Sequence, residues 1–271
     1  MIAKLKERLV AAMRRNGLDL RPMRLASGKL GGASLQWDRD EPWRRRGILV
    51  ESPHYPVPVR FFVSRPQDLI QREHATGRFY EEEELAIIAA HYRGGTFVDV
   101  GCNIGNHSIY MLKLAGAERV VAFEPNPTVL ALLRINLAVN DLASRVTIHE
   151  VGLADSAGTA SIDVPETNLG AGRLSREGEA GQGGTLQLAR GDDLLGDTDA
   201  GFIKMDVEGF ELAALAGLKQ TILRCQPVLF VEVEDQNLPP FRDFLASVGY
   251  RLAETFCRYP GLTNCLAVPA G

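Results

Sequence analysis

The sequence predicts a mixed α/β fold built on a buried, mostly parallel β-sheet. Short apolar segments alternate with amphipathic helical segments from residue 96 to the end of the chain. The apolar segments carry few polar residues, which is typical of strands covered by helices on both faces. The last two of them are joined through residues 256–261 with no helix between them, so we expect an antiparallel hairpin at the sheet edge.

The N-terminal part is expected to be an extension of that fold. Residues 2–13 place apolar side chains on one face of a basic helix, which we interpret as a helix docked on the protein itself. Contact of residues 1–15 with an anionic membrane surface is the alternative. Residues 47–50 and 57–63 predict a hairpin. The four glutamates at 81–84 are interpreted as the first turn of a helix, without a catalytic role.

The core elements follow in order. Residues 126 and 127, Asn and Pro, are a good cap and first position for a helix. Residues 159–188 interrupt the alternation, and we expect them to form a mobile cover above the carboxyl ends of the strands. We therefore divide the chain into an extension at 1–93 and a domain at 94–271 with that insertion. Strands are expected at 96–100, 119–123, 146–151, 202–206, 228–233, 250–254 and 264–268, and helices at 106–115, 127–139, 210–223 and 239–248.

A glycine turn follows the first core strand and predicts a ligand site. Gly101 and Gly105 would let the backbone approach a ligand closely, and the helix that follows offers free N–H groups. Asn103 stands where a dinucleotide-binding turn has its second glycine, and Asp99 precedes the first. This pattern favours a ligand without a pyrophosphate and with a cationic group near Asp99. A tight turn with no ligand is the alternative.

Glu124 ends the second core strand, 25 residues after Asp99, and suits a ribose diol. A nucleoside that carries a small zwitterion meets these demands, so the sequence predicts S-adenosylmethionine as the cofactor. Further cofactor contacts are expected from residues near these strand ends, with a plain turn as the alternative for the last of them. These residues are Asn106, Ser108, Asn126 and Asp155.

Three motifs resemble those of the FkbM family of S-adenosylmethionine-dependent methyltransferases. They are Asp99-Val-Gly-Cys-Asn-Ile-Gly-Asn-His-Ser, Phe123-Glu-Pro-Asn and Ile203-Lys-Met-Asp-Val-Glu-Gly-Phe-Glu211. The resemblance covers about half of the chain, and Cys102 replaces the alanine usual in the first motif. It implies a class I methyltransferase (Rossmann-like) fold and methyl transfer to a hydroxyl of a sugar or secondary metabolite.

The third motif supplies the candidate catalytic residues. Asp206 and Glu208 lie two positions apart at a strand end, so either could take a proton from the acceptor, and Lys204 could pair with either carboxylate. Capping of the next helix by Asp206 is the alternative. Together with Glu232 and Glu234 these acids could hold a divalent metal, which is possible but not favoured because the group contains no histidine. His107 and His149 are interpreted as packing residues.

Composition narrows the class of protein. The chain has 271 residues, 45% hydrophobic and 24% charged, with a formal net charge of −4, which disfavours a nucleic-acid partner. No apolar run is long enough for a transmembrane helix, and the four cysteines favour the cytoplasm. The predicted function is O-methylation of a small molecule or saccharide. An S-adenosylmethionine-binding scaffold without turnover and an N-methyltransferase are the alternatives, and the oligomeric state is left open.

Overall fold

The computed structural model describes residues 24–27, 33–36, 47–163, 173–176 and 185–271. The expected helix at 2–13 and the membrane contact proposed for residues 1–15 lie outside these residues. None of the helices in the described ranges is long and apolar enough to cross a membrane.

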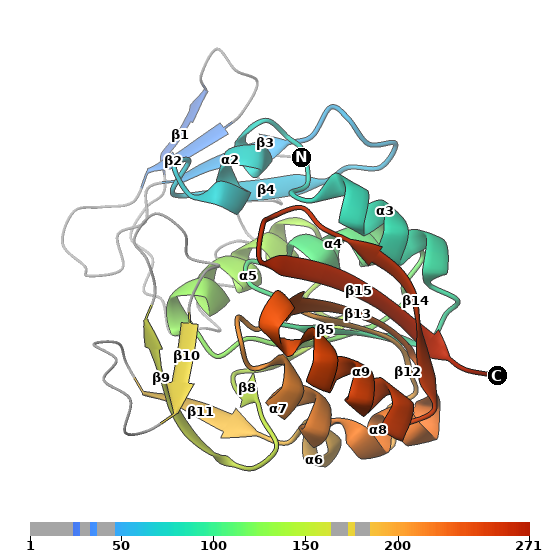
Figure 1. Cartoon of the computed structure of the whole chain (residues 1–271). Coiled ribbons are helices and arrows are strands. Elements are labelled where there is room, and N and C mark those ends of the chain that lie inside the picture. The colour runs from blue at the N-terminus through green and yellow to red at the C-terminus, as the bar shows by residue number, and fades with distance from the viewer. Residues whose placement is uncertain (1–23, 28–32, 37–46, 164–172, 177–184) are drawn as a thin grey trace.

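A seven-stranded sheet forms the centre of the molecule, in the order β14-β15-β13-β12-β5-β6-β7 (Figure 1). The five strands from β13 to β7 form four parallel pairs, while β15 is antiparallel to both β13 and β14. The mostly parallel sheet and its antiparallel C-terminal hairpin are therefore confirmed. The strands are β5 (Thr96–Val100), β6 (Val120–Phe123), β7 (Val146–His149), β12 (Ala200–Met205), β13 (Val228–Glu234), β14 (Tyr250–Phe256) and β15 (Leu262–Pro269).

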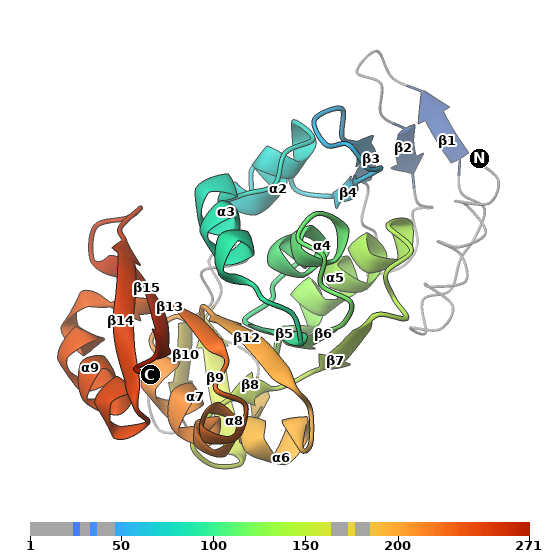
Figure 2. The ribbon, with the colours of Figure 1, turned by 90° about the vertical axis from the view of Figure 1, so that its right-hand side faces the viewer.

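Helices cover both faces of this sheet, as continuous apolar strands require (Figure 2). Alternate strand residues point to opposite faces: Val98 joins one hydrophobic cluster and Phe97 the other. The helices on the Phe97 face are α3 (Glu82–His91), α4 (Asn106–Lys113) and α5 (Pro127–Val139), and those on the Val98 face are α6 (Gly191–Leu195), α7 (Glu211–Gly217), α8 (Lys219–Cys225) and α9 (Leu238–Ser247), preceded by the short η1 (Asp235–Asn237).

One predicted helix is two helices in the structure. We expected a single helix at 210–223, but α7 ends at Gly217 and α8 begins at Lys219. The backbone of Gly217 lies so close to the carbonyl oxygen of Ala154 that an added Cβ would be 2.0 Å from it. The break therefore coincides with a close backbone contact that favours glycine, and an apolar pattern alone does not reveal such a contact.

The N-terminal extension forms a second sheet in the order β1-β2-β3-β4, and it packs on the outer side of α4 and α5 (Figure 2). The predicted hairpin is β3 paired with β4. Asn136 in α5 accepts a hydrogen bond from the backbone N–H of Phe62 and donates one to the carbonyl of Ile104, so it ties β4 and the turn after β5 to this helix. The elements of the extension are β1 (Arg24–Ser27), β2 (Ala33–Gln36), β3 (Gly47–Glu51), β4 (Arg60–Val63) and α2 (Leu69–Ala75).

The extension and the central sheet share one hydrophobic cluster. Phe61 of β4, Phe79 and Leu85 pack in the same cluster as Phe97 of β5. A boundary at residues 93 and 94 remains a prediction, but the two parts do not have separate cores.

The insertion after β7 forms a small sheet in the order β10-β9-β11-β8. β9 lies at the start of the segment that interrupts the alternation. Residues 164–172 and 177–184 lie outside the described ranges, so the mobile cover remains a prediction. The strands are β8 (Gly152–Leu153), β9 (Gly158–Asp163), β10 (Arg173–Arg176) and β11 (Thr185–Ala189).

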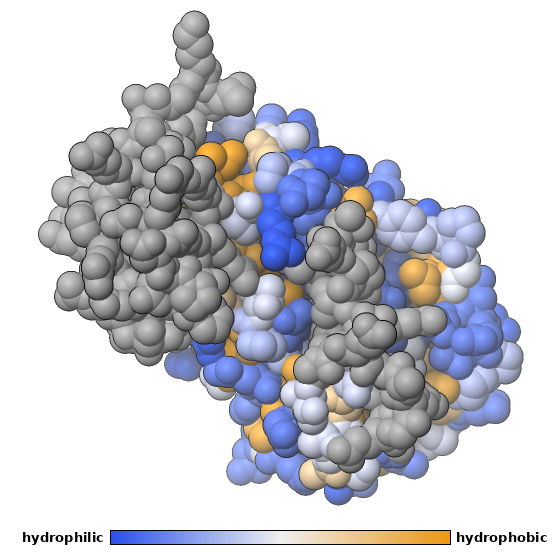
Figure 3. All heavy atoms as spheres, turned by 90° about the vertical axis from the view of Figure 1, so that its left-hand side faces the viewer, coloured by the Kyte–Doolittle hydropathy of each residue, from blue (hydrophilic) through white to orange (hydrophobic). Residues whose placement is uncertain are grey.

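The described surface shows scattered rather than clustered apolar residues. In Figure 3, hydrophilic and hydrophobic residues are interspersed on the visible described face. The large hydrophobic side chains that are exposed among the described residues are Ile48, Val57, Leu223 and Tyr259. Scattered residues of this kind are normal on a protein surface, and the position of Tyr259 is considered below.

Candidate functional site

The glycine turn after β5 has the expected shape, and its glycines lie close to other parts of the protein. Gly101 has φ 74° and Gly105 has φ 91°, both in the left-handed region that glycine adopts readily. A Cβ on Gly101 would lie 1.8 Å from the carbonyl oxygen of Asp206, and one on Gly105 would lie 2.7 Å from Leu133 Cδ1. We expected both glycines to make room for a ligand. The structure shows that they make room for the residue after β12 and for α5, and their contact with a ligand stays a prediction.

Glu124 at the end of β6 is fixed by two backbone amides. Its Oε2 accepts from the N–H of Asn103 at 3.0 Å, and its Oε1 accepts from the N–H of Asn126 at 2.8 Å. Burial raises the pKa of Glu124 to about 7, although both amides act in the opposite direction. Each carboxylate oxygen keeps a second lone pair, so this rigid carboxylate can accept two hydroxyl hydrogen bonds. The residues of this edge thus fit the diol of a nucleoside.

The charge beside Asp99 is the second feature of the site. Asp99 is fully buried, and its Oδ1 lies 3.7 Å from Lys204 Nζ while its Oδ2 accepts from Ser108 Oγ at 2.5 Å. Lys204 Nζ is also 3.7 Å from Asp206 Oδ2 and donates to the carbonyl of Gly101 at 3.0 Å. The sequence predicted a ligand cation near Asp99. In the structure, Lys204 is the cation next to that carboxylate.

Burial sets the electrostatics of this group. Burial disfavours the charged form of Lys204 and so acts to lower its pKa. The negative charges of Asp206 and Asp99 have the larger combined effect and raise the pKa of Lys204. Burial also raises the pKa of Asp99, against the influence of Lys204 and Ser108. The predicted pairing of Lys204 with Asp206 is present, as the distance between Nζ and Oδ2 shows.

Two expectations about the loop after β12 need correction. β12 ends at Met205, and Glu208 has φ 47°, so the extended alternation that would place Asp206 and Glu208 on one side does not continue. The first position before α7 is Phe210, with no side-chain capping bond, so Asp206 is not the cap of that helix. Glu208 nevertheless acts on Glu232, whose pKa is raised by burial and then by Asp206, Glu81 and Glu208.

Glu81 belongs to this site, although the sequence predicted no functional role for it. Residues 82–84 form the first turn of α3 as expected, but Glu81 precedes that turn with φ 59° and ψ 47°. Its Oε2 lies 4.0 Å from His107 Nε2, and its side chain is 15% exposed. Asp206, Lys204 and Arg258 all influence its titration. The left-handed backbone of Glu81 separates it from the other three glutamates. The sequence of four glutamates in a row does not reveal this conformation.

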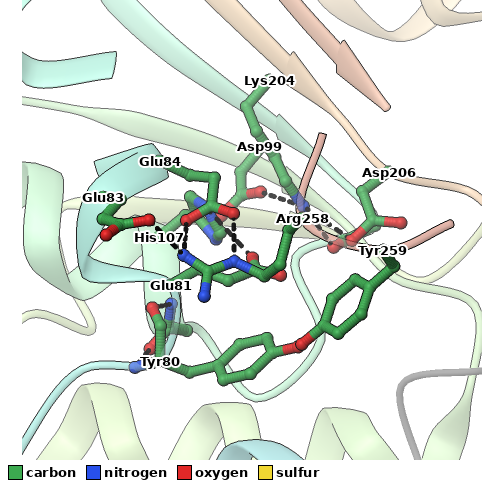
Figure 4. A network of polar contacts seen from close by, with 12 residues as sticks. Tyr80, Glu81, Glu83, Glu84, Asp99, His107, Lys204, Asp206, Arg258 and Tyr259 are labelled. Carbon is green, nitrogen blue, oxygen red and sulfur yellow. Dashed lines mark hydrogen bonds and ion pairs between the residues drawn. The ribbon is translucent and has the colours of Figure 1, made fainter. Parts of the chain in front are cut away.

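The hairpin between β14 and β15 completes the site from the other end of the chain. Arg258 binds both carboxylate oxygens of Glu84, which is 1% exposed, and also contacts Glu83. The hydroxyl groups of Tyr80 and Tyr259 are 2.8 Å apart. Figure 4 shows these side chains gathered with Lys204, Asp206 and Asp99, so that α3, β5, β12 and the hairpin meet at one place.

The other residues expected to contact the cofactor are mostly engaged with the protein. The side chain of Asn106 bonds to the backbone of Tyr80 in both directions and to His74 Nε2. Ser108 is fully buried against Asp99, so it supports that carboxylate. Asn126 caps α5 through the N–H of Thr128. Any cofactor contact from their backbones, and from Asn103, remains a prediction.

The remaining candidates lie nearby or apart. Asp155 is exposed in the turn between β8 and β9, where it accepts from Ser156 Oγ, and its expected contact with the adenine stays untested. His149 stacks on Phe123 with ring centroids 5.0 Å apart, which agrees with its expected packing role. Within the described ranges, no group of three or more His, Cys, Asp or Glu residues is arranged to hold a metal ion.

Comparison with known proteins now places this site in a family. Residues 99–252 match the Methyltransferase FkbM domain. The chain belongs to the FkbM methyltransferase family. The resemblance seen in the three sequence motifs is thereby confirmed. Glu81 and Arg258 lie outside the matched range, and Glu124, Lys204 and Asp206 lie within it.

Two curated methyltransferases and one solved structure extend the comparison. Methyltransferase sdnD of Sordaria araneosa is 34% identical over 111 residues, 41% of this chain and 43% of that protein. Hexuronic acid methyltransferase AglP of Haloferax volcanii is 35% identical over 141 residues, 50% of this chain and 54% of that protein. The chain thus spans about half the length of these relatives. A crystal structure of methyltransferase FkbM from Methylobacillus flagellatus KT matches with a TM-score of 0.51 at 22% identity, covering 74% of this chain and 52% of that one, which supports the class I fold.

Proposed function

We propose that this protein is an S-adenosylmethionine-dependent O-methyltransferase that acts on a hydroxyl of a small molecule or saccharide. Its FkbM domain supports methyl transfer, and the name of its AglP relative supports a sugar acceptor. One observation carries the proposal most. Glu124 presents its carboxylate at the carboxyl end of β6, and Lys204 and Asp206 stand two strands away at the same edge of the sheet.

Each group has a role in this proposal. Glu124 would accept hydrogen bonds from the ribose hydroxyls, and the N–H groups at the start of α4 would face the carboxylate of the amino-acid part. When bound, S-adenosylmethionine would supply a methyl group on a positively charged sulfur. The protein would then hold the acceptor oxygen in line with that group, and such positioning is the largest contribution expected for this reaction. The neighbouring carboxylates would receive the acceptor proton.

The acceptor would lie between the start of α3 and the β14–β15 hairpin. Tyr80 and Tyr259 offer aromatic faces and hydroxyl groups there, and Tyr259 is partly exposed. Aromatic rings with a polar end suit a ligand that has both apolar and hydroxyl surfaces, such as a sugar ring. The proposed location of the protein is the cytoplasm, in line with four unpaired cysteines, and fractionation of the producing cells tests it.

Calorimetry on the full chain tests the proposal in two steps. The first step titrates S-adenosylmethionine into the protein and into Glu124→Gln, which keeps the shape but removes the charge. Loss of hydrogen bonds to a charged acceptor, worth about 1.5–3 kcal/mol, predicts ~10- to 100-fold weaker binding by the variant. The second step measures release of S-adenosylhomocysteine with hydroxyl acceptors, including hexuronic acid glycosides, and with matched amines.

The outcomes separate the alternatives. Turnover with hydroxyl acceptors supports the proposal. Turnover with the amines alone would change it to N-methylation, and binding without turnover across the panel would favour a scaffold. A folded protein that binds no S-adenosylmethionine would refute the proposal as a whole.

A further inference from the structure

We infer that the carboxylate of Glu81 is the base that receives the proton of the acceptor hydroxyl. The inference rests on the proposed function and names a residue of the same site. Glu81 lies outside residues 99–252, so the match to the family domain says nothing about it.

The backbone of Glu81 is held in an unfavourable conformation. Its φ of 59° and ψ of 47° are left-handed, which is unusual for a residue with a Cβ and points to a functional constraint when the surroundings enforce it. The preceding residue is fixed by Asn106, whose side chain accepts from the N–H of Tyr80 and donates to its carbonyl. No side-chain capping bond forms at the start of α3. The carboxylate of Glu81 therefore points into the site rather than at its own helix.

The charged and titratable groups around Glu81 come from every element at this edge. His107 Nε2 lies 4.0 Å from its Oε2, and burial together with Lys204 lowers the pKa of His107 well below its usual range, so this imidazole is neutral at pH 7. Asp206 and Glu84 add negative charge, while Lys204 and Arg258 add positive charge. The remaining neighbours that interact with Glu81 are Tyr80 and Glu232.

These surroundings make Glu81 a better base than Asp206. Lys204 Nζ lies 3.7 Å from Asp206 Oδ2, so that carboxylate already forms an ion pair with a buried lysine. Burial, followed by Asp206 and Glu84, raises the pKa of Glu81 to about 7. A carboxylate with a pKa near the working pH is partly ionised and still takes up a proton readily, as general base catalysis requires. The 15% exposure of its side chain leaves a route for the proton to water.

The step balances in atoms and charge. The acceptor oxygen forms its new bond to the methyl carbon, and the electron pair of the broken carbon–sulfur bond stays on sulfur. The hydroxyl proton moves to Glu81, and the resulting carboxylic acid releases it to water before the next turnover. No oxidant, metal or further reactant takes part.

Glu81→Gln tests the inference, because it keeps the size of the side chain and removes its ability to take a proton. Glu82→Gln is the matched control, since Glu82 is the next residue and is 41% exposed. For the wild type, kcat/KM with a hydroxyl acceptor should rise with pH through a limb centred near 7. Glu81→Gln should lower kcat by ~10²- to 10⁴-fold and abolish the limb, and it should change S-adenosylmethionine affinity less than about twofold. Glu81→Asp should keep the limb at a reduced rate.

A direct titration complements the kinetics and needs no acceptor. Carboxyl ¹³C NMR of the wild type should show a resonance that titrates near pH 7 and is missing in Glu81→Gln but present in Glu82→Gln. Absence of that resonance, normal turnover by Glu81→Gln, or a limb that disappears only in Asp206→Asn would each overturn the inference. A wild type that binds no S-adenosylmethionine would instead refute the proposed function, so the two failures are distinguishable.

Discussion

Gly101→Ala should destabilise the protein because the added methyl group has no space. The new Cβ would lie 1.8 Å from the carbonyl oxygen of Asp206, which belongs to the chain leaving the neighbouring strand. The ends of β5 and β12 would have to separate, although Asp206 N also bonds to the carbonyl of Val100 at 3.0 Å. Overpacking of this kind costs about 1–3 kcal/mol. The left-handed backbone at φ 74° adds roughly 1–2 kcal/mol for a residue with a Cβ.

Gly116→Ala provides the matched control. Gly116 has φ 78°, close to that of Gly101, but a Cβ there would meet no atom within 4 Å. This variant should lose only the conformational part, roughly 1–2 kcal/mol. The difference between the two variants therefore isolates the contact with the carbonyl of Asp206.

Urea unfolding at pH 7 measures both variants against the wild type. Gly101→Ala should lose about 2–5 kcal/mol in the free energy of unfolding, and Gly116→Ala less than half of that. Equal losses in the two variants would refute the argument. So would a Gly101→Ala protein of normal stability that has lost only its affinity for S-adenosylmethionine, because the glycine would then serve the ligand.

The remaining predictions concern charge. Lys204→Met should lower the free energy of unfolding by about 3–5 kcal/mol in urea, because it leaves the fully buried Asp99 without its cation. Adding Asp99→Asn to this variant should recover part of the loss. A double variant that is as unstable as Lys204→Met alone would contradict this reason. Glu81→Gln should be more stable than the wild type at pH 8 by about 3 kcal/mol and equal to it at pH 4. The pKa of Glu81 is raised from 4.5 to about 7 in the folded state, so the wild type loses stability as pH rises through this range and the glutamine variant does not. Thermal unfolding at both pH values checks the sign, and a gap that widens toward pH 4 would reverse it. Arg258→Met should destabilise the protein by about 2–4 kcal/mol, because it leaves the almost completely buried Glu84 without its partner. Adding Glu84→Gln should restore part of the loss, as measured by urea unfolding. An Arg258→Met variant as stable as the wild type would show that the pair adds nothing to stability.

The sequence was sufficient for the central sheet because its signals are local. Apolar runs, the Asn126 cap followed by proline, and Gly101 and Gly105 in the turn all act within a few residues, and the structure has each of them. The edge hairpin followed from the missing helix between β14 and β15. The match of residues 99–252 to the Methyltransferase FkbM domain then confirmed the family.

The site itself was only partly predictable because it depends on contacts between distant segments. The spacing of Asp99 and Lys204 cannot show that they are register neighbours on β5 and β12. Nor can the run at 81–84 show that its first member adopts a left-handed conformation and faces His107. The sequence did not show that Lys204 places a cation next to Asp99, and the ligand cation expected there stays a prediction.

The bond between Glu84 and Arg258 joins residues 174 positions apart. During synthesis, Glu84 at the start of α3 leaves the ribosome long before Arg258 in the β14–β15 hairpin. Glu84 therefore cannot form this ion pair until Arg258 has been synthesised. Closing such a long loop is slow and entropically costly. The wall of the site near Tyr80 should consequently form last, after the sheet has assembled. A nascent chain stalled before residue 258 would lack β15, so β14 would have no partner in the sheet and this edge of the site would be unfinished.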